Sequence, residues 1–176
     1  MDSRVSALLD KQEIKEVVLR YCRGIDRRDF DLVRNCYHSD AHDHHGSFSG
    51  NIDEFIDWVE KLTKCYRWTM HLVGNVLIDL GESGDDGAVA ACETYGVSLH
   101  RSDDLEPYMN LAMGFRYLDR FERRSGNWKI AERTALGEWS MKLPHDIWWE
   151  IPDNRLSGRR DPNDALYTLL ASIRSQ

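Results

Sequence analysis

GFRYLDRFERRSGNWKIAER, residues 114–133, decides the fold because it contains two alternating segments that meet at a tight turn. Residues 110–123 alternate between inward and outward side chains, which is typical of a strand with one buried face. The buried face is predicted to carry Leu111, Met113, Phe115, Tyr117, Asp119 and Phe121. Residues 124–127 are typical of a hairpin turn, and residues 128–142 are predicted to form the second strand.

Two further long strands precede this hairpin. Residues 68–80 and 88–101 have the period of a strand, and the glycine-rich residues 81–87 between them predict a turn. A polar connection at residues 102–107 leads into the hairpin. The second half of the chain is therefore predicted to be a meander of four long antiparallel strands.

The first half of the chain has a helical period instead. Residues 5–23 are predicted to form an amphipathic helix that breaks near Gly24, with a buried stripe of Ile14, Val17, Val18, Tyr21, Cys22 and Ile25. Asp29 is a predicted N-cap of a second, short helix, and residues 38–50 are predicted to be a short strand and loop. Asn51 and Glu54 have the spacing of a capping box that begins a third helix.

Helices followed by a strand meander predict an α+β fold. We expect a curved antiparallel sheet wrapped around three N-terminal helices, with a cone-shaped pocket on its concave side. Residues 1–143 form this domain, and residues 144–176 form a C-terminal extension with two adjacent tryptophans and a short helical pattern. The extension is expected to cover the pocket or an oligomer interface.

The composition excludes several classes of function. A chain of 176 residues with 41% hydrophobic and 30% charged side chains is typical of one globular domain. Its net charge of −7 argues against a nucleic-acid partner. The chain has no apolar run near the length of a membrane span and no signal-peptide core, so a cytoplasmic location is expected. The four cysteines show no C-x-x-C spacing and are expected to be buried thiols.

His71 is the leading candidate for chemistry. Thr69, His71 and Val73 share one face of the predicted strand, and Asp26 continues the flank of the helical stripe four residues beyond Cys22. An aspartate that holds one nitrogen of a neutral imidazole leaves the other nitrogen as a general base. The alternative interpretation is a core or rim histidine and a helix-end carboxylate.

Two other side chains are candidates to polarise a substrate or assist a leaving group. Tyr21 lies within the helical stripe, so its hydroxyl is either a hydrogen-bond donor to substrate or a satisfied core group. Arg133 is opposite in phase to Ile130, Glu132 and Thr134, and it either stabilises a developing anion or faces solvent.

Further pocket residues follow from strand position alone. The predicted ligand-binding residues are Asn75, Tyr95, Asn110, Tyr117 and His44. His42, His44 and His45 also suggest a zinc or iron site with His71 and Asp43, but their spacing matches no defined metal motif, and no metal or cofactor is predicted.

Four stretches of this chain resemble the SnoaL-like branch of the nuclear-transport-factor-2-like superfamily. They are residues 14–31, 37–50, 69–75 and 114–133. This resemblance implies a cone of bent sheet closed by three helices. It also implies similarity to scytalone dehydratase, bile-acid dehydratase and hexachlorocyclohexane dehydrochlorinase, in a family of which many members are cofactor-free.

The resemblance also assigns roles. Asp26 and His71 match an aspartate and a histidine of the dehydratase-like members, Tyr21 matches a tyrosine of bile-acid dehydratase, and Arg133 matches an arginine of the dehydrochlorinase. The dehydrochlorinase has lysine in place of Tyr21, and the arginine of the bile-acid enzyme aligns better with Gly137. The chain therefore combines features of several members.

The expected function is that of a cofactor-free lyase or isomerase that removes a proton from a small hydrophobic cyclic molecule. The alternative is a non-catalytic ligand-binding module or a small structural subunit of a ring-hydroxylating dioxygenase. A homodimer or homotrimer is expected, because relatives commonly assemble through the outer face of the sheet.

Overall fold

The computed structural model describes residues 2–81, 87–103 and 110–174. Most of the predicted turn at residues 81–87 and most of the connection at residues 102–107 therefore lie outside the described residues. The elements in chain order are α1 (Ser3–Arg27), α2 (Phe30–Asn35), β1 (Tyr37–His45), β2 (Phe48–Asn51), α3 (Ile52–Thr63), β3 (Tyr66–Leu80), β4 (Val89–Ser102), β5 (Asn110–Arg124), β6 (Asn127–Leu143), the 3-10 turn η1 (His145–Ile147) and α4 (Ala165–Arg174). The predicted α+β class is confirmed.

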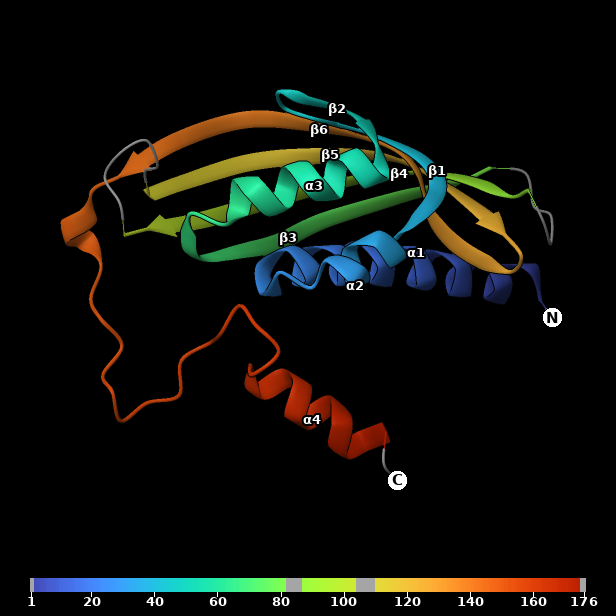
Figure 1. Ribbon diagram of the computed structural model, residues 1–176. Coiled ribbons are helices and arrows are strands. Elements are labelled where there is room, and N and C mark those ends of the chain that lie inside the picture. The colour runs from blue at the N-terminus through green and yellow to red at the C-terminus, as the bar shows by residue number, and fades with distance from the viewer. Residues whose placement is uncertain (1, 82–86, 104–109, 175–176) are drawn as a thin grey trace.

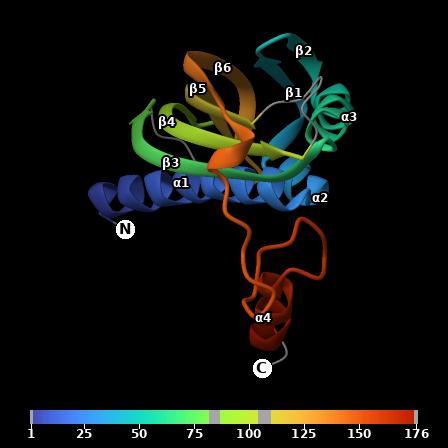
Figure 2. The ribbon, with the colours of Figure 1, turned by 90° about the vertical axis from the view of Figure 1, so that its left-hand side faces the viewer.

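One curled, open sheet contains all six described strands, in the order β2-β1-β6-β5-β4-β3. Its neighbours pair antiparallel except β1 and β6, which run parallel, so the sheet is mixed rather than purely antiparallel as predicted. Helix α1 packs against β3, and α3 packs against β1 and β2. The helices therefore close the open side of the curled sheet (Figures 1 and 2).

Helix α1 is longer than its sequence predicts. The break expected near Gly24 is wrong, because the helix continues to Arg27 and ends at Arg28, which adopts the left-handed conformation at φ 55°. Gly24 serves close packing instead, since a Cβ there would lie 2.6 Å from a methyl carbon of Val33 on α2. This continuation carries Asp26 on the last turn of α1.

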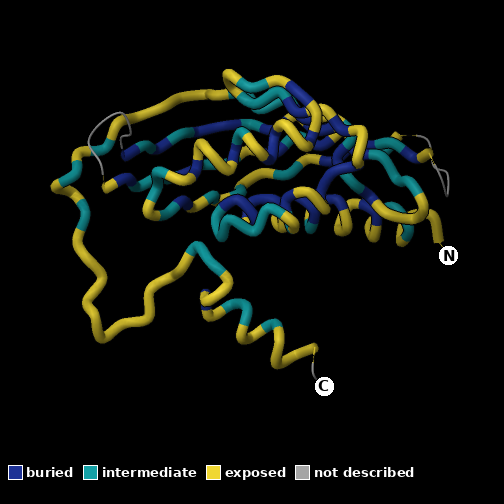
Figure 3. The backbone as a smooth tube through the Cα atoms, viewed as in Figure 1, coloured by how far each residue is buried: buried dark blue, intermediate teal, exposed yellow. Residues whose placement is uncertain are grey.

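The core fills the space between the helices and the concave face of the sheet (Figure 3). Its fully buried apolar side chains include Ile14 and Val18 of α1, Phe55 of α3, Phe121 of β5 and Ile130 of β6. Each contributes about 1.5–3 kcal/mol relative to an exposed position. The predicted capping box of α3 is confirmed, since Asn51 and Glu54 each accept a hydrogen bond from the other's backbone N–H.

A β-bulge in β6 determines which side chains enter the core. Ile130 and Glu132 both pair with β5, whereas Ala131 between them has no partner there. The extra residue shifts the alternation, so that Ile130 and Arg133 both point to the concave face and are both fully buried. The prediction that Arg133 is opposite in phase to Ile130 is therefore wrong.

The C-terminal residues after β6 leave the sheet and return along the helices. Helix α4 lies against the α1–α2 side of the domain, where Tyr167 donates a hydrogen bond to Asp29 at 3.1 Å (Figure 2). Within the described part of the chain, no helix is both long and apolar enough to cross a membrane.

Candidate active site

Asp26 and His71 meet where the last turn of α1 crosses strand β3. The Asp26 carboxylate accepts a hydrogen bond from His71 Nδ1 at 2.7 Å through Oδ1 and one from the His71 backbone N–H at 2.9 Å through Oδ2. Thr69, on the same strand face as His71, donates its hydroxyl to Oδ1 at 2.9 Å. The side chains of His71 and Asp26 are only 8% and 13% exposed, so the pair is shielded from water.

These contacts keep the carboxylate of Asp26 ionised. Burial by itself would raise the pKa of Asp26, but the hydrogen bonds from His71 and Thr69, together with the charge of His71, lower the pKa below its usual value. The carboxylate is therefore ionised at neutral pH and only accepts hydrogen bonds. When the His71 ring is uncharged, this contact places its proton on Nδ1 and leaves the lone pair of Nε2 as a base.

Aromatic rings surround the imidazole of His71. Phe115 of β5 contacts it edge-on with ring centroids 5.9 Å apart, and His100 of β4 does so at 5.8 Å. Burial, together with His71, lowers the pKa of His100 to about 3, so this second imidazole is neutral at pH 7. His100 contacts Tyr66 in turn, with the two rings tilted and their centroids 4.9 Å apart. The imidazole of His71 is therefore in contact with flat rings that carry no charge at neutral pH.

A second polar cluster lies beyond Phe115. Arg133 forms a two-point salt bridge with Asp119, with both N–O distances 2.7 Å and both side chains fully buried. The rings of Tyr21 and Tyr117 each have their centroids 4.1 Å from the guanidinium carbon. Tyr117 contacts Phe115 at 4.5 Å, which connects this cluster to His71.

A SnoaL-like domain model matches residues 6–134, which is most of the chain. The chain belongs to the SnoaL-like domain family. No curated protein gives a significant sequence match.

Solved structures share the fold of this SnoaL-like domain. A candidate scytalone dehydratase from Novosphingobium aromaticivorans DSM 12444 is 17% identical with a TM-score of 0.69, covering 88% of this chain and 99% of its own. A hexachlorocyclohexane dehydrochlorinase from Novosphingobium barchaimii LL02 is 17% identical with a TM-score of 0.70, covering 85% and 99%. A Mycobacterium tuberculosis protein of unknown function is 18% identical with a TM-score of 0.64, covering 99% and 92%. At such identities the likeness establishes the fold alone.

The SnoaL-like domain brings two of the four predicted catalytic residues together and places the other two elsewhere. Asp26 and His71 are in direct contact, as described above. Tyr21 and Arg133 contact each other and are connected to His71 through Tyr117 and Phe115. Two of the guanidinium nitrogens of Arg133 bond Asp119, and burial raises the pKa of Tyr21, so its phenol stays protonated.

The predicted ligand-binding residues are scattered. Asn75 is exposed at a bulge of β3, and Tyr95 lies on the outer face of the sheet, 43% exposed beneath Arg116. Both line a shallow hollow on that outer face with Trp139, so their predicted place inside the pocket is wrong. Asn110 is fully buried and accepts a hydrogen bond from the backbone N–H of Ser102 at 2.9 Å, which ties β5 to the end of β4. Tyr117 is the one member of this set on the concave side next to Phe115.

The histidines of β1 divide between the two faces of the strand. His44 and His42 lie together, with Ser49 of β2 bridging their rings at 2.9 and 3.2 Å. Among the residues that the structure describes, no three histidine, cysteine or acidic side chains could together hold a metal ion. His44 is therefore placed in a polar cluster of its own, not beside His71.

Sequence reasoning missed a second histidine–carboxylate contact on the concave face. Asp43 is almost fully buried, accepts the Tyr37 hydroxyl at 2.7 Å, and lies 3.3 Å from Nδ1 of His45. The His45 ring faces Tyr117 at 5.8 Å between centroids. The alternation of β1 was the available signal, because Asp43 and His45 share a face only when residues 37–45 are assigned as a strand.

Proposed function

We propose that this protein is a lyase or isomerase that removes a proton from a small hydrophobic cyclic substrate, with His71 as the general base and Asp26 as the group that orients it. The observation that carries the proposal is the 2.7 Å hydrogen bond from Nδ1 of His71 to an ionised, shielded carboxylate. It fixes the tautomer in which Nε2 is the base.

The proton is taken from a carbon next to a carbonyl or other activating group. The electron pair of the broken C–H bond moves into the substrate and forms a carbon–carbon double bond, while Nε2 of His71 gains the proton. Asp26 stabilises the imidazolium that results, since an opposite charge at hydrogen-bond distance favours the charged form. In an elimination the leaving group departs with its bonding electrons, and His71 then returns the proton to a departing hydroxide or to water. In an isomerisation the proton returns to another carbon of the same substrate.

The surroundings of His71 support a flat, apolar substrate. Phe115 and His100 present ring edges or faces to the imidazole, and both rings are uncharged at neutral pH. Aromatic side chains favour ring-shaped ligands through stacked and edge-on contacts. The names of two structural neighbours, a candidate scytalone dehydratase and a hexachlorocyclohexane dehydrochlorinase, agree with elimination from a cyclic compound.

The test is turnover of a panel of cyclic alcohols, chlorinated rings and cyclic enones in deuterated water. We expect at least one compound to lose water or chloride, or to gain deuterium at an activated carbon, at a rate proportional to enzyme concentration. His71→Gln should abolish this activity. His42→Gln, which alters an exposed histidine bonded to Ser49, is the matched control and should retain it. Full activity in His71→Gln contradicts the proposal.

A further inference from the structure

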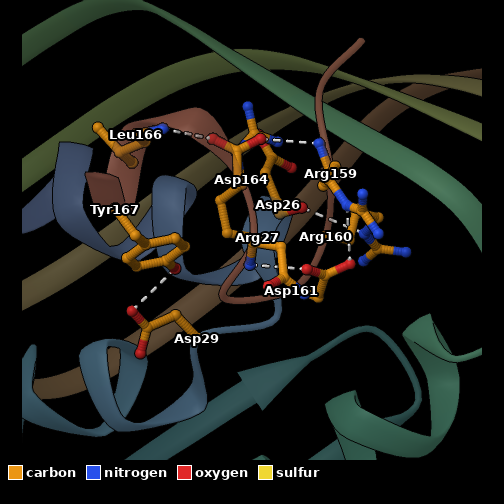
Figure 4. Close-up of polar contacts among 10 residues, drawn as sticks. Asp26, Arg27, Asp29, Arg159, Arg160, Asp161, Asp164, Leu166 and Tyr167 are labelled. Carbon is orange, nitrogen blue, oxygen red and sulfur yellow. Dashed lines mark hydrogen bonds and ion pairs between the residues drawn. The ribbon is translucent and has the colours of Figure 1, made fainter. Parts of the chain in front are cut away.

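Arg160, in the segment that leads to α4, inserts its guanidinium between the ends of three elements of the domain (Figure 4). Its Nε donates to the carbonyl of Asp26 at 3.1 Å, and Nη2 donates to that of Ile25 at 3.4 Å. Nη1 donates to the carbonyls of Thr63 at 3.1 Å and Tyr66 at 2.7 Å. All four acceptors are backbone oxygens.

These oxygens lie where a cation is favourable. Ile25 and Asp26 belong to the last turn of α1, and Thr63 is the last residue of α3. The last four carbonyls of a helix lack partners within the helix, and they form the negative end of its dipole. The planar guanidinium has five N–H donors in a fixed arrangement, so one side chain can satisfy carbonyls of both helices at once.

Arg160 is a permanent cation in this position. Burial, with help from the nearby Arg28, lowers its pKa to about 10, which still leaves it protonated at pH 7. Removing the side chain would leave carbonyls of α1, α3 and β3 without these donors. A buried polar group that is left without a hydrogen-bond partner destabilises the fold.

Other contacts hold the segment around Arg160 in place. Asp164 accepts the backbone N–H groups of Arg159 at 2.7 Å and Leu166 at 3.0 Å, and it lies 3.6 Å from Arg27 of α1. Tyr167 reaches Asp29 at the turn between α1 and α2 (Figure 4). The chain on the C-terminal side of Arg160 is therefore bound to the same helix end that carries Asp26.

We propose that Arg160 is a positioning residue that holds Asp26 against His71. One guanidinium bonds the backbone of Asp26 at the end of α1 and the backbone of Tyr66 at the start of β3, the strand on which His71 lies five residues later. It thereby fixes the two elements that carry the partners of the 2.7 Å hydrogen bond. The catalytic meaning of this arrangement rests on the proposed function, whereas the arrangement itself is testable without a substrate.

The test follows the Nδ1 proton of His71 by NMR in the full-length protein. A ring N–H that is held by a carboxylate exchanges slowly with water and gives a separate downfield resonance, which Asp26→Asn identifies by its loss. We expect the resonance in the wild type and in Arg159→Ala, whose side chain bonds Asp161 at the surface. Arg160→Ala should lose the resonance, and added methylguanidinium should restore it by occupying the vacated position.

A resonance that persists in Arg160→Ala overturns the proposal, as does an equal loss in Arg159→Ala. If Arg160→Ala does not fold, Arg160→Lys carries the test, because lysine keeps the charge but cannot span carbonyls of three elements. Loss of the resonance in a folded Arg160→Lys supports the proposal, and its retention overturns it. Failure of the proposed function is seen separately, as unimpaired turnover in His71→Gln.

Discussion

The carboxylate of Asp26 holds His71 at two points, the ring Nδ1 at 2.7 Å and the backbone N–H at 2.9 Å. A contact to the ring alone would leave the imidazole free to move with its strand. The contact to the backbone fixes the strand relative to the end of α1, so the ring orientation and the strand position are set by one side chain. This geometry makes Asp26 the residue on which the proposed base depends.

Asp26→Asn should reduce turnover strongly while preserving the fold. The amide is the same size as the carboxylate, but its NH₂ group can donate to Nδ1, which would place the ring proton on Nε2 and remove the base. General-base catalysis contributes about 100- to 10,000-fold, and we expect a loss in that range. The measurement is the kcat of the variant on the substrate found in the deuterium-exchange screen. A kcat within twofold of the wild type would show that Asp26 does not orient the base.

Arg133 is expected to act on stability rather than on the reaction. Its salt bridge with Asp119 is fully buried, and leaving one charge of such a pair without its partner costs about 3–5 kcal/mol. Arg133→Met should therefore lower the free energy of unfolding by about that amount, measured by urea denaturation. Arg133→Met combined with Asp119→Leu removes both charges and should recover much of the loss. If the double variant is as unstable as the single one, the pair is not the main source of the effect.

The sequence predicted the fold well because its periodic patterns were long. The alternation of residues 110–123 and the helical stripe of α1 extend over many residues, so one local irregularity could not hide them. The Asp26–His71 pair is also predicted, from the faces on which the two residues lie together with the resemblance to dehydratase-like members of the family. Their contact is confirmed by the 2.7 Å hydrogen bond, while the catalytic role stays a prediction.

The errors in the site arose where one residue breaks the pattern. A bulge at Ala131 turns Arg133 inward, and a bulge at residues 74–75 leaves Asn75 exposed. Strict alternation cannot anticipate an extra residue, because nothing in its side chain marks it. Arg160 was also missed, since its role depends on backbone carbonyls of three distant elements.

His100 should make the protein less stable in mild acid. Burial and His71 lower its pKa from 6.5 to about 3, so between these values the unfolded chain binds a proton at this residue that the folded chain does not. Its contribution to stability is therefore present above pH 6.5 and is lost as the pH falls toward 3, with a slope of at most about 1.4 kcal/mol per pH unit.

His100→Phe removes this titration and should flatten the dependence of the unfolding free energy on pH between 6.5 and 4. Phenylalanine is a suitable replacement because Nδ1 of His100 has no partner in the described chain. His42→Phe, at an exposed position, is the control and should leave the slope unchanged. An unchanged slope in His100→Phe would show that His100 does not stay neutral in the folded protein.

We expect the outer face of the sheet to be buried in the subunit interface of a homodimer or homotrimer. Leu72 of β3 and Trp139 and Met141 of β6 lie there and are 57%, 44% and 53% exposed, although all three are large apolar side chains. Leu72→Glu combined with Met141→Glu should convert the oligomer to a monomer in sedimentation equilibrium, because charges are poorly tolerated at the centre of an interface. Leu156→Glu, at a 96% exposed position after β6, should leave the assembly intact. A monomeric wild type would refute this expectation.

The bulge in β6 allows a test of whether its extra residue, Ala131, is needed for the packing of the core. Deleting Ala131 would remove the extra residue, so Ile130, Glu132 and Arg133 would follow in strict alternation with Arg133 still facing Asp119. We expect the deletion variant to fold with the salt bridge between Arg133 and Asp119 intact, because only the unpaired residue of the bulge is lost. Ala131→Gly keeps the extra residue and should cost no more than about 1 kcal/mol. The measurement is the near-ultraviolet circular dichroism of both variants, and loss of the native signal in the deletion variant would show that the core needs the bulge itself.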